Sequence, residues 1–167
     1  YDRRIFDLDD EINRKLSKLD AALQRCNIRL SNYVSNTDSK SYKEVVARIS
    51  EGITDPKVLV EEIHGRIINR HGRKTIIAAL TGVITQADSD MMRQIREEID
   101  IAERHKQECI DKMQEICEKE YSDQLRNLQT IPGVKLRAAT SLIAEIGIDM
   151  SHFETANHLA SWSGLKP

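Results

Sequence analysis

Apolar residues recur at intervals of three and four along two long stretches of the chain, which is the spacing of a heptad repeat. The first stretch carries Ile5, Ile12, Leu16, Leu19, Leu23, Cys26, Leu30 and Tyr33, with Asp9 at its one polar position. The second carries Met92, Ile95, Ile99, Ala102, Lys106, Cys109, Met113 and Ile116, before its phase shifts to Tyr121, Leu125 and Leu128. These spacings predict two long amphipathic helices of the coiled-coil type.

Neither helix can bury its apolar stripe alone, so each needs a partner helix. We expect an antiparallel pair, and we expect the chain to form a homodimer or a higher homo-oligomer. Heptad spacing does not fix the partner or the orientation, so the pairing can lie within one chain or between two. We assign the dimer contact to five residues of the first stretch: Ile12, Leu16, Leu19, Leu23 and Leu30.

Shorter helices separated by turn residues are predicted between the two long ones. Residues 35–40 are typical of a loop, and residues 41–52 predict a short helix that stops near Gly52. Asp55 at a capping position and Pro56 in the first turn then begin a helix of about 15 residues that ends at Gly72. Residues 73–82 predict one more short helix.

A Pro-Gly pair divides two amphipathic patterns near the end of the chain, in LQTIPGVKLRAATSLIAEIG at 128–147. One helix should end after Leu128, residues 131–134 should turn, and a second helix should run from Leu136 to Ile146. A helix-hairpin-helix has this layout, and it points free backbone N–H groups toward a phosphate. We therefore predict nucleic-acid contacts at Gly133, Val134, Lys135 and Arg137. The alternative is an ordinary turn between helices, since Lys135 replaces the usual second glycine.

The predicted fold is therefore all-α. It consists of a long antiparallel coiled-coil hairpin with a small helical tip, followed by a helix-hairpin-helix-like module. We assign residues 1–34 to the first coiled-coil helix, 35–86 to the tip, 87–124 to the second coiled-coil helix and 125–167 to the start of the C-terminal module.

Charge is segregated locally rather than globally, because the formal net charge is only −2. Residues 63–86 contain no acid but carry Arg66, Arg70, Arg73 and Lys74. Arg66, Arg70 and Lys74 are four apart and share one helical face if the helix continues through Gly72. This pattern predicts a phosphate contact, and the alternative is a solvated helix face. Residues 88–120 are acidic and should not touch nucleic acid.

Several classes of function find no support in the sequence. Cys26, Cys109 and Cys117 lack CxxC spacing, which argues against a zinc site and a secreted disulfide framework. We find no complete catalytic or metal-binding motif, and we expect no small-molecule substrate. The cysteine usage leads us to expect a cytoplasmic, reducing setting. No apolar run approaches the ~18 residues of a membrane span, and no charged-then-apolar signal segment begins the sequence. Because the chain opens at Tyr1 without a methionine and closes at Pro167, we expect a piece of a larger protein.

The C-terminal stretch resembles the DEDD-type insertion-sequence transposases of the one-ten group, which are bridge-RNA-guided recombinases. The resemblance rests on Ile131-Pro132-Gly133, Ala139 with Leu142, Ala144-Glu145-Ile146-Gly147, Phe153 followed by Ala156, Leu159-Ala160, and Gly164-Leu165 with Pro167. These elements cover about a quarter of the chain, and the paired heptad helices before them are similar to the coiled coil of that family.

The resemblance implies a mobile-element enzyme that acts on DNA, and it makes a guide RNA a further expected partner. Its RuvC-like domain, with four acids and magnesium, would precede Tyr1, and its nucleophilic serine would follow Pro167. We therefore carry over no catalytic residue, neither Ser161 nor Ser163, and we expect no cofactor in this segment. The segment should assemble and contact nucleic acid without cutting it. Two alternatives stay open: a stand-alone helix-hairpin-helix DNA-binding module, and a purely structural coiled-coil interaction protein.

Overall fold

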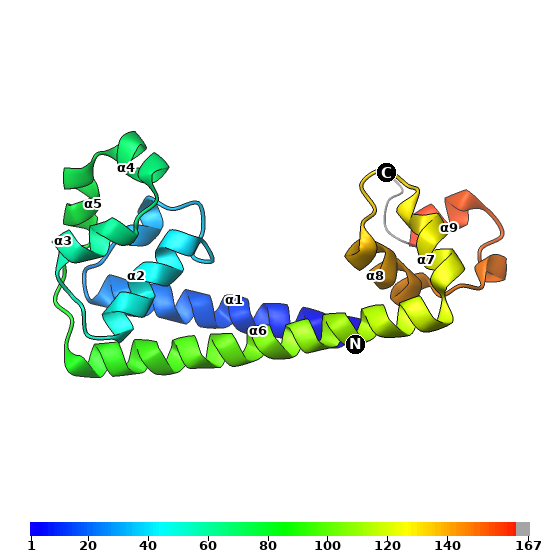
Figure 1. The fold of residues 1–167 in the computed structure, drawn as a ribbon, viewed down its shortest axis with the longest axis horizontal. Helices are drawn as coiled ribbons and strands as arrows, with labels where there is room; N and C mark the ends of the chain where they lie inside the picture. The colour runs from blue at the N-terminus through cyan, green and yellow to red at the C-terminus, as the bar shows by residue number, and fades with distance from the viewer. Residues whose placement is uncertain (163–167) are drawn as a thin grey trace. The chain divides into compact units, whose positions relative to one another are not determined.

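A computed structural model describes residues 1–162, and within this range the chain forms helices, turns and loops without a strand (Figure 1). The all-α prediction is confirmed. The chain divides into two compact units. We call Asp7–Lys106 the coil–tip unit, and we call Tyr1–Phe6 together with Gln107–Pro167 the C-terminal unit. Helices α1 (Asp2–Arg25) and α6 (Gln86–Glu120) have residues in both units.

In the coil–tip unit, α1 and α6 lie side by side and run in opposite directions (Figure 1). Lys106 Nζ donates to Asp9 Oδ1 at 2.6 Å, and Lys15 Nζ donates to Glu98 Oε2 at 2.6 Å. From the first contact to the second, the residue number rises on α1 and falls on α6, as an antiparallel pair requires. Asp9 and Lys106 are the polar members of the two predicted stripes, and they meet. A paired polar layer of this kind fixes the register of two helices.

The first helix ends earlier than its heptad pattern predicted. The pattern continues to Tyr33, but α1 stops at Arg25 because Asn27 adopts a left-handed conformation with φ of 63°. The Ile28 N–H donates to Leu23 O at 2.9 Å and the Asn27 N–H donates to Gln24 O at 3.0 Å, which is a Schellman cap. Buried Ile28 therefore turns back onto the helix, and residues beyond it belong to a separate turn, η1 (Leu30–Asn32).

The tip consists of short helices: α2 (Lys40–Ser50), α3 (Pro56–Leu59), η2 (Val60–Glu62), α4 (Gly65–His71) and α5 (Arg73–Ala79). The Asp55 cap is confirmed, because its side chain accepts a hydrogen bond from the Lys57 N–H. The predicted helix of about 15 residues is wrong, since the chain leaves the helical conformation at Ile63. There the His64 N–H donates to Ser41 Oγ on α2 at 2.9 Å instead of to a helical carbonyl.

Two backbone hydrogen bonds attach the tip to the end of α1. The Arg29 N–H donates to Ala79 O at 2.8 Å, and the Val83 N–H donates to Cys26 O at 3.0 Å. Gly82 lies at this crossing, where an added Cβ would stand 2.0 Å from Cys26 O. Only glycine fits that approach, so the connection between α5 and α6 is closely tied to the turn after α1.

A capping box begins α6. Asp88 Oδ2 accepts from the Thr85 N–H at 2.9 Å, while Thr85 Oγ1 accepts from the Asp88 N–H at 3.2 Å. The hydrogen bonds from the Thr85 hydroxyl and N–H hold the pKa of the Asp88 carboxyl below its usual value. This end of α6 was predicted to lie near Ala87, within one residue of its observed start at Gln86.

The C-terminal unit contains α7 (Ser122–Gln129), α8 (Leu136–Ile146), η3 (Met150–His152) and α9 (Ala156–Trp162). Its core is formed by Cys117, Leu125, Ala139 and Ile143, with Tyr121, Leu128, Val134 and Leu136 packed against it. The predicted phase shift after Ile116 corresponds to the break between α6, which ends at Glu120, and α7. The shift lets Leu125 face α8 and bury its side chain.

Candidate nucleic-acid interface

The basic residues predicted at the tip are distributed over two helices. Arg66 and Arg70 are one turn apart on α4 and so share a face of that helix. Gly72, with φ of 84°, ends α4, and α5 begins at Arg73. Lys74 would share the Arg66–Arg70 face only in a helix that continues through Gly72, and the positive φ at Gly72 breaks that helix.

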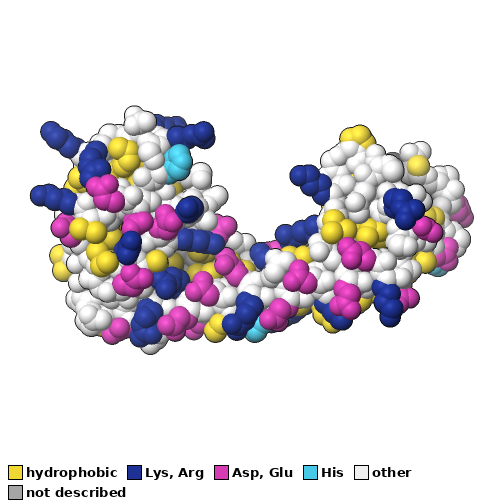
Figure 2. All heavy atoms as spheres, in the orientation of Figure 1, with side chains coloured by type: hydrophobic (Ala, Val, Ile, Leu, Met, Phe, Trp, Pro, Cys, Tyr) yellow, Lys and Arg dark blue, Asp and Glu magenta, His cyan; other side chains and the backbone are white. Residues whose placement is uncertain are grey.

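The four predicted basic residues of the tip differ in whether an acidic side chain forms an ion pair with them. Arg73 forms an ion pair with Glu61, which lowers the pKa of that carboxyl. In the described part of the chain no acid lies within ion-pair distance of Arg66, Arg70 or Lys74. All three are exposed, and Figure 2 shows Lys and Arg side chains projecting from the body that carries α4 and α5. Three of the four predicted cations therefore present uncompensated charge.

A cavity of about 380 Å³ adjoins the arginines of α4. It is lined by Asn32, Tyr33, Val34, Ser35, Arg66, Ile67, Arg70 and His71, with no acid among them. Tyr33 and His71 meet edge to face, with ring centroids 5.2 Å apart at 78°. The sequence pattern had placed Tyr33 in the coiled-coil stripe. Its place in this cavity follows from the turn at Asn27, which the heptad pattern did not reveal.

The basic face is fixed by the way α4 begins. His64 caps this helix, with its Nδ1 accepting from the Arg66 N–H at 3.1 Å. His71 lines the cavity, whereas His64 uses one ring nitrogen to hold the first turn of the helix that carries both arginines.

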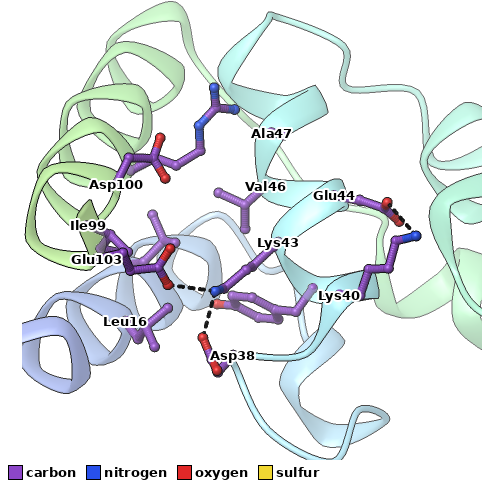
Figure 3. Close-up of a pocket in the computed structure, with 13 residues that line it drawn as sticks. Leu16, Asp38, Lys40, Lys43, Glu44, Val46, Ala47, Ile99, Asp100 and Glu103 are labelled. Atoms are coloured by element: carbon purple, nitrogen blue, oxygen red, sulfur yellow. Dashed lines mark hydrogen bonds and ion pairs between the residues drawn. The ribbon is translucent and has the colours of Figure 1, made fainter. Parts of the chain in front are cut away.

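A larger cavity, of about 530 Å³, is lined mainly by residues of α1, α2 and α6, and acids predominate in its lining. Figure 3 shows Lys43 between two carboxylates, and its Nζ lies 2.8 Å from Asp38 Oδ1 and 2.8 Å from Glu103 Oε1. Four acids line this cavity against three bases. Arg96 lines it too, with one buried guanidinium nitrogen, Nη1, that has no hydrogen-bond partner among the described residues. The excess of acids makes this cavity a poor site for phosphate.

The predicted hairpin is a type II turn. The Val134 N–H donates to Ile131 O at 3.0 Å, Pro132 takes the second position, and Gly133 takes the third with φ of 89°. An added Cβ at Gly133 would meet nothing within 4 Å, so its surface is open. Lys135 then begins α8 as its N-cap without a side-chain hydrogen bond to the helix. Lys135 and Arg137 are both exposed beside this turn.

The five residues assigned to the dimer contact are buried within the fold of a single chain. Ile12, Leu16, Leu19, Leu23 and Leu30 are between 1% and 5% exposed, and residues of the same chain cover them. Self-association stays a prediction. Any contact that used these side chains would have to replace the pairing of α1 with α6 by an exchange between chains.

The comparison with known families points to one group of mobile-element proteins. Residues 125–167 match the family described as Transposase IS116/IS110/IS902 family, a match that begins in α7 and includes the hairpin and α8. No curated protein and no solved structure matches the chain. The Gly164-Leu165 and Pro167 elements of the predicted resemblance lie outside the described residues.

Two further observations bear on the class of protein. Within residues 1–162, none of the helices combines the length and the apolar composition that a bilayer crossing requires. No three His, Cys, Asp or Glu side chains in that range are grouped so as to hold a metal ion. The family match confirms the predicted resemblance to an insertion-sequence transposase: residues 125–167 of this chain are similar to the IS116/IS110/IS902 transposase family.

Proposed function

We propose that this chain is a nucleic-acid-holding scaffold within a transposase, with its first contact at the basic face of α4. The family match supports a role in transposition, for which DNA is the partner. The observation that carries the proposal is the contrast in charge pairing at the tip. Arg48, Lys43 and Arg73 are each matched by an acid, but Arg66 and Arg70 are not.

Uncompensated arginines on a shared helical face suit a phosphate backbone. Each phosphate neutralised by a cation releases condensed counterions, and this release favours binding without regard to base sequence. Arginine adds two parallel hydrogen bonds to phosphate oxygens, which lysine cannot supply. Lys74 on α5 would contribute a point charge from the neighbouring helix. An acidic protein partner would also be attracted, but it has no support from the family match.

The hairpin at 131–134 is the second proposed contact. The first N–H groups of α8 have no side-chain cap, and Gly133 leaves the surface beside the turn open. Phosphate is well suited to such a helix start, because unpaired N–H groups and the helix dipole both favour an anion. Lys135 and Arg137 add positive charge at the same end of α8.

The described residues do not form a site for the magnesium that the resemblance implies for the rest of such an enzyme. Two of their carboxylates are engaged in a helix cap and an ion pair: Asp88 at the start of α6, and Glu98 with Lys15. We propose holding and assembly for this part of the protein.

Binding of two short DNA duplexes with unrelated sequences tests the proposal. Fluorescence anisotropy at low salt should show both duplexes bound, and the double variant Arg66→Ala with Arg70→Ala should weaken both by about tenfold. The matched control is Arg93→Ala with Arg104→Ala, which removes two arginines from exposed positions on acidic α6. Equal binding by all three proteins would reject the basic face and favour a purely structural coil.

A further inference from the structure

The cavity beside α4 combines features that a flat phosphate contact does not need. Tyr33 and His71 are half-buried rings in its wall, and Asn32 and Ser35 add polar groups. The cavity volume of about 380 Å³ lies within the range of ~300–1,000 Å³ that is usual for small-molecule sites. The arginines of α4 stand in the same wall.

We propose that this cavity takes up one unpaired nucleotide of a single strand. The inference rests on the proposed function, since it assumes that Arg66 and Arg70 contact the phosphates of a nucleic acid. The base enters the cavity and stacks on the aromatic wall, and the phosphates on either side of it lie against the two arginines. The shared chemistry is that of an unpaired nucleotide, in DNA or in RNA.

The concave shape and the aromatic wall favour an unpaired base over a duplex. A base inside a double helix is stacked between its neighbours and cannot offer its face to a protein ring. Unpaired bases are splayed out and stack on Tyr, His or Arg side chains, which is the usual way in which proteins hold single strands. The ring of His71, edge to face with Tyr33, fixes the orientation of this wall before binding.

The lining also argues against other occupants. No acid lines the cavity, so a cationic peptide finds no counter-charge there. A free phosphate or another small anion would use the arginines but would leave the aromatic wall without a role. The cavity shown in Figure 3 is lined by four acids and three bases, so it lacks the acid-free lining of the cavity beside α4.

The test uses short single strands of DNA and of RNA that carry 2-aminopurine, a base whose fluorescence falls when it stacks on an aromatic ring. Binding to the whole chain should quench this fluorescence. Tyr33→Leu should abolish the quenching and weaken single-strand binding by about tenfold. Tyr33→Phe keeps the ring and should retain both. Phe6→Leu, at an aromatic residue that is 63% exposed and outside the cavity, is the matched control.

The outcomes separate this proposal from the one on which it rests. Loss of quenching with Tyr33→Leu, while duplex binding is unchanged, supports the nucleotide cavity, and the DNA and RNA arms show which strand it prefers. If Arg66→Ala with Arg70→Ala weakens all binding but Tyr33→Leu changes nothing, the cavity is rejected and the phosphate contact stands. If neither variant affects any strand, both proposals fail. Unchanged far-ultraviolet circular dichroism verifies that each variant folds.

Discussion

Gly82 should be among the glycines of this chain least tolerant of a methyl group. Its ideal Cβ position lies 2.0 Å from Cys26 O and 2.9 Å from the Ile28 side chain. The nearest group is a backbone carbonyl at the end of α1, which cannot rotate away as a flexible side chain would. The substitution Gly82→Ala must therefore push apart the two segments that the Val83 N–H to Cys26 O hydrogen bond joins.

The expected cost combines overpacking and a lost hydrogen bond. Forcing a methyl group into a packed site costs about 1–3 kcal/mol, and losing the hydrogen bond adds about 1 kcal/mol. We therefore expect Gly82→Ala to lower the free energy of unfolding by roughly 2–4 kcal/mol. With a urea dependence of about 2 kcal/mol per molar, the unfolding midpoint should fall by about 1–2 M.

Gly65→Ala is the matched control, because nothing lies within 4 Å of an added Cβ at that position. It should be neutral or slightly stabilising, by up to about 1 kcal/mol, since alanine restricts the unfolded chain. Hydrogen exchange of the Val83 amide supplies a local measurement, and its protection should fall only in Gly82→Ala. Equal midpoints for the two variants would refute the close approach at Gly82.

Three further predictions concern packing and assembly. Asp9→Leu and Lys106→Leu, singly and together, should give a coupling energy of about 0.2–1 kcal/mol in a double-mutant cycle, and strict additivity would contradict their pairing. Burial raises the pKa of the Cys26 and Cys117 thiols. Iodoacetamide near neutral pH should therefore modify Cys109 before the other two cysteines. Peptide mass spectrometry measures the three rates, and equal rates would disprove this order. Light scattering should give twice the chain mass of 19.1 kDa, and a mass of 19.1 kDa at tens of micromolar would reject self-association.

The long helices could be predicted because their apolar spacing reports burial directly. The stripes that begin at Ile5 and Met92 do pack on partner helices, and the polar exceptions Asp9 and Lys106 meet each other. The sequence left the choice between one chain and two open, because a heptad seam is equally satisfied by either. Only the structure shows that the pairing lies within the chain.

Helix ends were predictable where glycine or proline set them. Gly52, Gly72 and Gly133 all adopt positive φ at predicted stops or turns. The end of α1 was missed because asparagine signals a left-handed residue less strongly than glycine does. The break at Ile63 was missed because Ser41, which captures the His64 N–H, is more than twenty residues away in the sequence. Tertiary contacts of this kind leave no local pattern.

The candidate interface was predictable in its charges but not in its shape. Arg66 and Arg70 were found from a stretch without acids, but Glu61 lies just outside that stretch and neutralises Arg73. Tyr33 could not be found, because its heptad position pointed to the coil. Its position beside His71 depends on the turn at Asn27. The ion pair of Arg73 with Glu61 and the ring contact of Tyr33 with His71 are both made by the folded chain. Counting charges and rings along the sequence does not reveal such contacts.

The most direct test of the nucleic-acid scaffold is the salt dependence of duplex binding. The slope of log Kd against log salt concentration counts the phosphates that the protein neutralises, at about 0.9 per contact. Relative to the unchanged chain, Arg66→Ala with Arg70→Ala should lower the slope by about two contacts, and Arg93→Ala with Arg104→Ala should leave it unchanged. Equal slopes for all three proteins would contradict the account, because the basic face of α4 would then carry no phosphate.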